Sequence, residues 1–191
     1  KENLDIITWN CEFFPTAGDS TIDALTESIL DLNPDIIAFQ EIKNRGWFGK
    51  LMNNLIDYDY IISQQSSFMD QAFIYKKHDF NLVNRLELFA ENDYNFAGRP
   101  PLKIDILHKH SEMKLSIINL HMKCCDSGLN RRKEASKMLY NYLDSTINDN
   151  SNVIVLGDWN DDLKDEDEEH CFSPFLEDQR FIFPTLDITY D

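Results

Sequence analysis

The chain alternates short apolar runs with segments whose apolar residues recur every three or four positions. Runs of this length predict buried strands, and the longer period predicts amphipathic helices. Strands are predicted at 4–9, 35–40, 58–63, 72–75, 80–89, 102–107, 114–120 and in the run that begins at Val153. Helices are predicted at 21–32, 48–55 and 130–147.

The order of these elements favours one layered domain. Strands are grouped in the middle of the sequence with helices before and after them, which predicts a mixed sheet or a two-sheet sandwich flanked by helices. No repeat or linker divides the chain, and 191 residues with 42% hydrophobic content can form a substantial core. We therefore expect a single α/β (α+β) domain over residues 1–191, and a monomer.

Polar residues end four of the predicted strands, where a core would favour apolar groups. They are Asn10, Glu41, His121, Asp158 and Asn160. Open α/β sheets place their chemistry at the carboxyl ends of strands, so these residues predict a shared site. Asp158 and Asn160 point the same way in extended chain. One can accept a proton from water while the other orients that water or holds a phosphoryl oxygen.

Charge and side-chain chemistry narrow the kind of site. Glu41 supplies the hard oxygen that Mg²⁺ or Mn²⁺ prefers, and His121 can bond or protonate a phosphoryl oxygen. The net charge of −16 argues against capture of nucleic acid by a broad basic face. A metal held by carboxylates would supply positive charge locally. Taken singly, Asn10 also fits a turn cap and His121 a satisfied core histidine.

The four cysteines, Cys11, Cys124, Cys125 and Cys171, lack Cys-x-x-Cys spacing, so no structural zinc site is expected. A disulfide from Cys124 or Cys125 to Cys171 would imply an oxidising compartment, secreted or periplasmic, whereas free buried thiols leave the location open. No run approaches the roughly 18 apolar residues that span a membrane. The start lacks both Met and a signal-peptide core, so we expect a processed or engineered chain.

Five stretches together resemble the motifs of the endonuclease/exonuclease/phosphatase superfamily, which includes deoxyribonuclease-I-like nucleases, abasic-site endonucleases, inositol polyphosphate phosphatases and sphingomyelinases. In family order they are Ile-Thr-Trp-Asn at 7–10, Ile-Ala-Phe-Gln-Glu at 37–41, Gly-Arg-Pro-Pro at 98–101, Ile-Asn-Leu-His at 118–121 and Leu-Gly-Asp-Trp-Asn at 156–160. The resemblance implies a four-layer sandwich of two mixed β-sheets flanked by helices. It also implies a hydrolase of phosphoric esters that depends on Mg²⁺ or Mn²⁺.

The resemblance assigns roles to the strand-end residues. Glu41 would bind the divalent metal with help from Asn10, and His121 would contact the scissile phosphate. Asp158 would orient or deprotonate the attacking water, while Asn160 holds the phosphate or the nucleophile. The reaction would be in-line hydrolysis of a phosphodiester, in nucleic acid or another compound, or of a phosphomonoester.

Three further residues take expected roles from the same motifs. Arg99 matches an arginine near the substrate phosphate, and its planar fork suits phosphate; a surface ion pair is the alternative. Asn119, in the motif of His121, is expected at the substrate. Asp70 stands where many members carry a carboxylate that orients the motif histidine.

The sequence departs from the family at its end. Members finish with a strand that carries Asp-His, whereas the last histidine here is His170. We expect a truncated chain that lacks C-terminal strands and is weakly active or inactive; a catalytically inactive scaffold is an alternative.

A calcium-binding module is a second alternative. Asp158, Asn160, Asp162 and Glu169 nearly reproduce EF-hand spacing, but Leu163 stands where the loop needs Gly. The acidic run at 161–169 is expected to be a solvated loop.

Overall fold

The computed structural model describes residues 3–148, 151–166 and 168–186. Its strands are β1 (Ile6–Phe14), β2 (Ile36–Ile42), β3 (Tyr58–Ile62), β4 (Asp70–Lys76), β5 (Phe80–Glu87), β6 (Leu102–His108), β7 (Lys114–His121) and β8 (Val153–Asp158). Its helices are α1 (Asp19–Leu32), α2 (Arg45–Asn54), α3 (Leu129–Thr146) and α4 (Ser173–Leu176), with 3₁₀ turns at Ala90–Asn92 and Asp126–Gly128.

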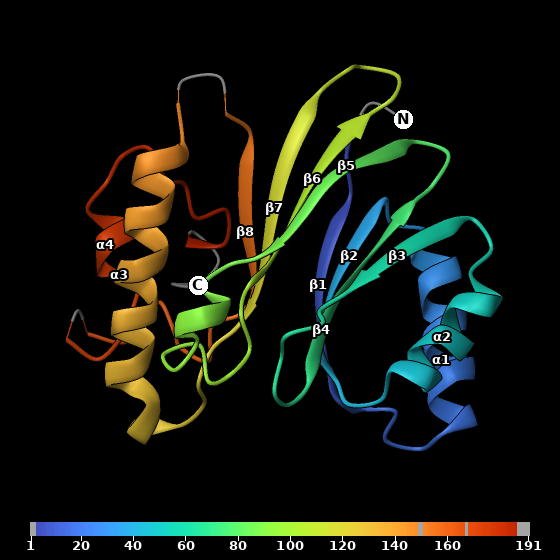
Figure 1. Cartoon of the computed structure of the whole chain (residues 1–191), viewed down its shortest axis with the longest axis horizontal. Coiled ribbons are helices and arrows are strands. Elements are labelled where there is room, and N and C mark those ends of the chain that lie inside the picture. The colour runs from blue at the N-terminus through green and yellow to red at the C-terminus, as the bar shows by residue number, and fades with distance from the viewer. Residues whose placement is uncertain (1–2, 149–150, 167, 187–191) are drawn as a thin grey trace.

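The elements form a four-layer sandwich (Figure 1). One sheet has the order β1-β2-β4-β3 and is covered by α1 and α2, and the other has the order β5-β6-β7-β8 and is covered by α3 and α4. Only β1–β2 and β7–β8 are parallel pairs among the described strands; the remaining pairs are antiparallel. The predicted sandwich of two mixed sheets flanked by helices is confirmed.

The apolar run of β2 shows why the central strands are apolar at every position. Successive side chains of a strand point to opposite faces. Ile37 and Phe39 therefore pack beneath α1 and α2, while Ile36 and Ala38 pack against the second sheet. A strand covered on both faces needs apolar residues throughout, which explains the unbroken run in the sequence.

Two strands differ from their predicted form. The prediction ended the first strand at residue 9, but β1 continues because its register shifts after Asn10 and Phe14 then pairs with Ile42. The run beginning at Val153 was expected to be buried, yet every residue of β8 is half-buried. In the described part of the chain β8 is an edge strand, with a cavity of about 990 Å³ beside it.

The described residues after β8 contain the short α4, which was not predicted, and no further strand. Residues 187–191 lie outside the described residues. Among the described helices, none has both the length and the apolar character needed to cross a bilayer.

Candidate active site

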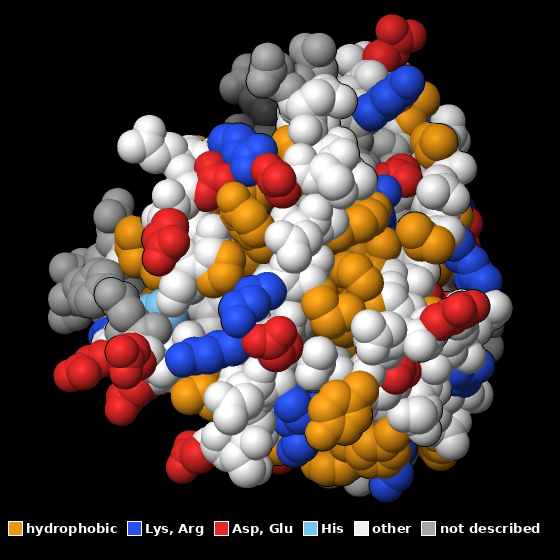
Figure 2. All heavy atoms as spheres, turned by 60° about the vertical axis from the view of Figure 1, so that its left-hand side comes forward, with side chains coloured by type: hydrophobic (Ala, Val, Ile, Leu, Met, Phe, Trp, Pro, Cys, Tyr) orange, Lys and Arg blue, Asp and Glu red, His pale blue; other side chains and the backbone are white. Residues whose placement is uncertain are grey.

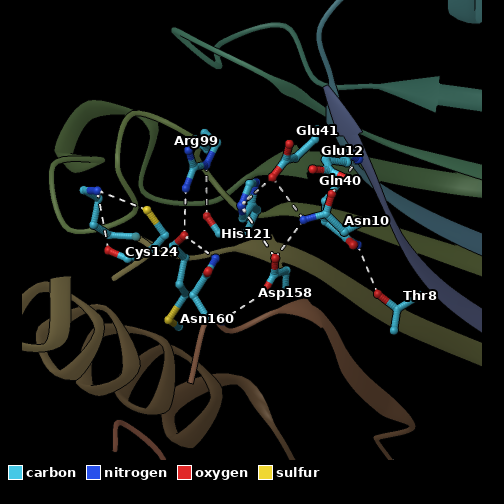
Figure 3. A network of polar contacts seen from close by, with 12 residues as sticks. Thr8, Asn10, Glu12, Gln40, Glu41, Arg99, His121, Cys124, Asp158 and Asn160 are labelled. Carbon is cyan, nitrogen blue, oxygen red and sulfur yellow. Dashed lines mark hydrogen bonds and ion pairs between the residues drawn. The ribbon is translucent and has the colours of Figure 1, made fainter. Parts of the chain in front are cut away.

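The two parallel strand pairs bring the predicted residues together. β1 and β2 end near β7 and β8 at one end of the sandwich (Figure 1). Glu41, His121 and Asp158 lie at the ends of β2, β7 and β8, and Asn10 lies in β1 where its register shifts; Figure 3 shows their side chains pointing toward one another. The sequence-based grouping of these residues agrees with their positions in the structure.

Asn10 links the two carboxylates of the site. Its Nδ2 donates to Glu41 Oε1 at 3.1 Å and to Asp158 Oδ2 at 2.8 Å, while its Oδ1 accepts from the Glu12 amide at 2.9 Å. Asn10 therefore also caps a turn, as the alternative interpretation expected, because its side-chain oxygen accepts from the Glu12 amide. One amide group fixes both the local turn and the separation of two carboxylates from different sheets.

Glu41 projects from an irregular point in β2. The pairing of β2 with β4 shifts between Phe39 and Ile42, and Glu41 has a φ of 65°. Bulges of this kind re-aim side chains and occur often beside active sites. The backbone amide of Phe13 donates to Glu41 Oε2 at 3.0 Å, so both carboxylate oxygens have a positioned donor.

Asp158 is positioned by its two neighbours in the motif. Gly157 lies against β7, where a Cβ atom would meet the Leu120 nitrogen at 2.7 Å and the Leu120 oxygen closer still. Only glycine permits that approach at the observed φ of 132°. The amide of Asn160 donates to Asp158 Oδ1 at 2.9 Å, and Asn160 Nδ2 donates to the Met122 carbonyl at 3.1 Å.

His121 is buried between the carboxylates. Its Nε2 lies 3.6 Å from Glu41 Oε1 and 3.8 Å from Asp158 Oδ2, and its Nδ1 has no hydrogen-bond partner within the described part of the chain. Burial, reinforced by the charge of Arg99, lowers the pKa of His121 to about 4 against the opposing effect of the two carboxylates. The imidazole is therefore neutral at pH 7.

Arg99 is buried beside His121 and is not a surface ion pair. Its Nε donates to the His121 carbonyl at 3.1 Å and its Nη2 to the Met122 carbonyl at 2.7 Å. Burial lowers its pKa, while Glu41, Cys124 and Asp158 act in the opposite direction. The guanidinium brings positive charge to the site and holds the backbone that follows β7.

Asp70 does not make the predicted orienting contact with His121. Its carboxylate forms a two-point ion pair with Arg45, at 2.6 and 2.8 Å, and accepts from the Ser63 hydroxyl at 2.9 Å. Arg45, at the first position of α2, reaches this carboxylate from across the β2–α2 connection. Nothing in the sequence marked Arg45 as the partner.

Asn119 is placed too deep for the predicted substrate contact. It is fully buried between the sheets, donates to the carbonyls of Phe39 at 2.8 Å and Ala72 at 3.3 Å, and accepts from Gln40 Nε2 at 2.7 Å. Gln40 also donates to Thr8 Oγ1 at 3.1 Å. Asn119 and Gln40 therefore join the two sheets beneath the site, a role that sequence reasoning missed for both.

The side chains of the site offer oxygen atoms of the chemical type that a divalent cation binds. Glu41 and Asp158 converge on one amide, and among the described residues neither is paired with a lysine or arginine. With His121 neutral, Arg99 is the cationic side chain that acts on the two carboxylates from nearby, and the carboxylate oxygens are hard ligands. The described residues contain no cluster of three or more His, Cys, Asp and Glu side chains arranged as a complete metal site.

The EF-hand alternative disagrees with the structure. Strand β8 stands where the entering helix of an EF-hand would be. The side-chain nitrogen of Asn160, Nδ2, donates to the Met122 carbonyl. Asp161 also departs from the expected solvated loop, because its carboxylate pairs with buried Arg132 at 3.0 and 3.2 Å. Residue 167 of this loop lies outside the described residues.

All four cysteines, each in a described residue, are free thiols. The disulfide from Cys124 or Cys125 to Cys171 is therefore not formed in this structure. The prediction of free buried thiols holds for Cys171, whereas Cys124 and Cys125 are exposed. The location of the protein, which was tied to this disulfide only conditionally, stays open to test.

Several solved structures share this fold. TDP2 of D. rerio in complex with a single-strand DNA product gives a TM-score of 0.71 at 17% identity, over 86% of this chain and 63% of that chain. The human Nocturnin catalytic domain gives 0.68 at 20%, over 90% and 68%. A mannosyl-6-phosphatase of Bacteroides thetaiotaomicron gives 0.69 at 15%, over 91% and 71%.

The chain thus spans less than two thirds of the TDP2 structure, and at these identities the likeness shows the fold alone. No curated protein sequence matches the chain significantly. The model of the endonuclease/exonuclease/phosphatase family matches residues 7–167, which include every strand end of the site. The match covers most of the sequence and agrees with the observed sandwich, so the chain belongs to the endonuclease/exonuclease/phosphatase family.

Proposed function

We propose that this chain is a divalent-metal-dependent phosphoesterase that hydrolyses a phosphodiester or a phosphomonoester with water as the nucleophile. The observation that carries the proposal is the convergence of Glu41 and Asp158 on the amide of Asn10, beside a neutral and buried His121. Two carboxylates without a direct lysine or arginine partner among the described residues, beside a neutral imidazole, suit phosphoryl chemistry better than a structural role.

Each site residue has a proposed role in hydrolysis that follows from its position. Glu41 would hold Mg²⁺ or Mn²⁺ with help from Asn10, which positions the Glu41 carboxylate; the cation when bound polarises the phosphoryl group and neutralises its developing charge. Asp158 accepts the proton of the attacking water, and the neutral imidazole of His121 donates to a phosphoryl oxygen. Asn160 and Arg99 hold the Met122 carbonyl, which keeps Asp158 and His121 at a fixed separation.

A short phosphate-ester substrate fits better than a long nucleic acid held by charge. The net charge of −16 disfavours a long nucleic acid held by charge, and the face in Figure 2, on the side of α3 and α4, has acidic and basic side chains interspersed. Nucleic acid remains a candidate because the TDP2 structure of this fold holds a single-strand DNA product. We further propose one domain over residues 1–191 and a monomer, which predict a single unfolding transition and a monomeric mass in sedimentation.

The test is hydrolysis of bis(p-nitrophenyl) phosphate and p-nitrophenyl phosphate with Mg²⁺, with Mn²⁺ and with chelator. Glu41→Gln is the site variant, and Glu134→Gln, an exposed carboxylate on α3, is the matched control. We expect weak metal-dependent turnover that Glu41→Gln removes and Glu134→Gln retains. A folded wild-type chain that hydrolyses neither ester would refute the proposal and favour the inactive scaffold.

A further inference from the structure

Two adjacent thiols lie beside the candidate active site. Cys124 and Cys125 are both exposed, in the segment between β7 and the 3₁₀ turn, and their sulfur atoms are 2.8 Å apart. Figure 3 shows Cys124 on the Arg99 side of the site. The sulfurs are thus in contact without any rearrangement of the chain, and solvent reaches both.

The surroundings make the two thiols chemically different. Lys123 Nζ lies 3.5 Å from Cys124 Sγ. The hydrogen bond from Cys125, with Lys123 and the charge of Arg99, lowers the pKa of Cys124, and the same contact raises the pKa of Cys125. Cys124 is therefore the better nucleophile, and Cys125 is a protonated neighbour.

The other two cysteines lack these features. Burial raises the pKa of Cys11 to about 12 and also raises that of Cys171. Peroxide-sensitive cysteines combine an accessible thiolate with a second thiol that resolves the oxidised product. Only the Cys124–Cys125 pair meets both conditions among the chain's four cysteines.

We propose that Cys124 and Cys125 form a reversible oxidation site for hydroperoxides, with Cys124 as the reacting thiol and Cys125 as the resolving thiol. The Cys124 thiolate attacks a peroxide oxygen, the O–O bond breaks, and the leaving oxygen takes a proton and departs as alcohol or water. Cys125 sulfur then attacks the Cys124 sulfenic acid, and its hydroxyl leaves as water with the Cys125 proton. One hydroperoxide is reduced by two electrons, and two thiols become a disulfide.

The backbone around the pair connects it to the site. Arg132 Nη1 donates to the Lys123 carbonyl at 3.0 Å and to the Cys125 carbonyl at 2.8 Å. The neighbouring Met122 carbonyl accepts from Arg99 and Asn160. A ring closed between adjacent residues constrains the Cys124–Cys125 peptide, which lies between the Lys123 and Cys125 carbonyls that Arg132 binds, so we expect oxidation to weaken these two hydrogen bonds. This effect on hydrolysis rests on the proposed function, whereas formation of the disulfide does not.

The first experiment treats the folded protein with hydrogen peroxide, alkylates the remaining thiols and analyses the peptides by mass. We expect the peptide with Cys124 and Cys125 to lose two hydrogens and to resist alkylation until dithiothreitol is added, while Cys11 and Cys171 stay reduced. Continued alkylation of Cys124 and Cys125, or a disulfide between two molecules, would overturn the inference.

Variants test the order of the two thiols. With Cys125→Ser, dimedone should trap a sulfenic acid on Cys124. Cys124→Ser should slow reaction with peroxide by more than about tenfold, and Lys123→Gln should slow it severalfold, with Lys114→Gln, at the exposed first residue of β7, as the control. Equal rates for Cys124→Ser and the wild type would contradict the assignment.

Hydrolysis measured before and after oxidation then tests the coupling. We expect a fall that dithiothreitol reverses in the wild type but that is absent in the Cys124→Ser, Cys125→Ser double variant. Because the mass and trapping results decide the oxidation site by themselves, an absence of hydrolysis in the reduced protein counts against the proposed function alone.

Discussion

Asp158 is the residue where the site's geometry is most constrained. Its Oδ2 faces Asn10 and its Oδ1 faces the Asn160 amide, so its orientation is fixed from both sides. Asp158→Asn keeps the shape but removes the basic oxygen. We expect turnover to fall by about 10²–10⁴-fold with Mg²⁺ affinity largely kept, because general-base catalysis contributes on that order. Rate measurements with titration calorimetry check this, and a rate like the wild type's would rule out the role.

His121 makes stability depend on pH in the chelator-treated protein. Its pKa is about 4 when folded, against about 6.5 when unfolded. Between these values the unfolded chain binds the proton and the folded chain does not, so stability is lost as the pH falls from about 6.5 to about 4. The loss approaches roughly 3 kcal/mol. Urea unfolding at each pH should show a shallower fall for His121→Gln, since the carboxylates titrate in both proteins; identical slopes would disprove the effect.

The residues that sequence reasoning placed well share a local signal. Asn10, Glu41, His121 and Asp158 are polar residues that each stand at the end of a predicted apolar strand, and strand ends meet by topology. Asp70 and Asn119 carry no sign of what covers them, because the partners of Asp70 come from α2 and Ser63, and those of Asn119 come from the facing sheet. Burial and pairing between distant elements decide such roles.

At the scale of elements, contact between β7 and β8 depends on Gly157. Gly157→Ala places a methyl group against Leu120 and requires a φ of 132°. We expect the free energy of unfolding to fall by several kcal/mol, on the order of core overpacking plus backbone strain, and Asp158 to be displaced.

The control is Gly49→Ala on α2, where nothing lies within 4 Å of the added Cβ. That control should gain about 0.5–1 kcal/mol from helix propensity, and thermal unfolding compares the two. Equal stabilities would contradict the close approach.

Element types were largely predictable from the sequence, and their limits were not. Apolar periodicity located the eight strands and the three long helices. The extension of β1 beyond Trp9 depends on pairing between Phe14 and Ile42, which no local pattern reveals. The half-buried state of β8 likewise depends on which strand lies beside it.

At the scale of the whole molecule, the net charge of −16 and the candidate metal site act on stability in separable ways. Repulsion among excess negative charges destabilises the compact state, and any salt screens it. A cation bound only by the folded chain adds a further term, about 2.7 kcal/mol at a concentration 100 times its Kd. Thermal unfolding in MgCl₂ and in NaCl at equal ionic strength therefore separates the two effects. We expect a higher Tm in MgCl₂, and Glu41→Gln should erase that difference while keeping the rise in Tm with NaCl. If the wild type unfolds at the same temperature in both salts, or if Glu41→Gln retains the Mg²⁺ increment, Glu41 does not hold the metal.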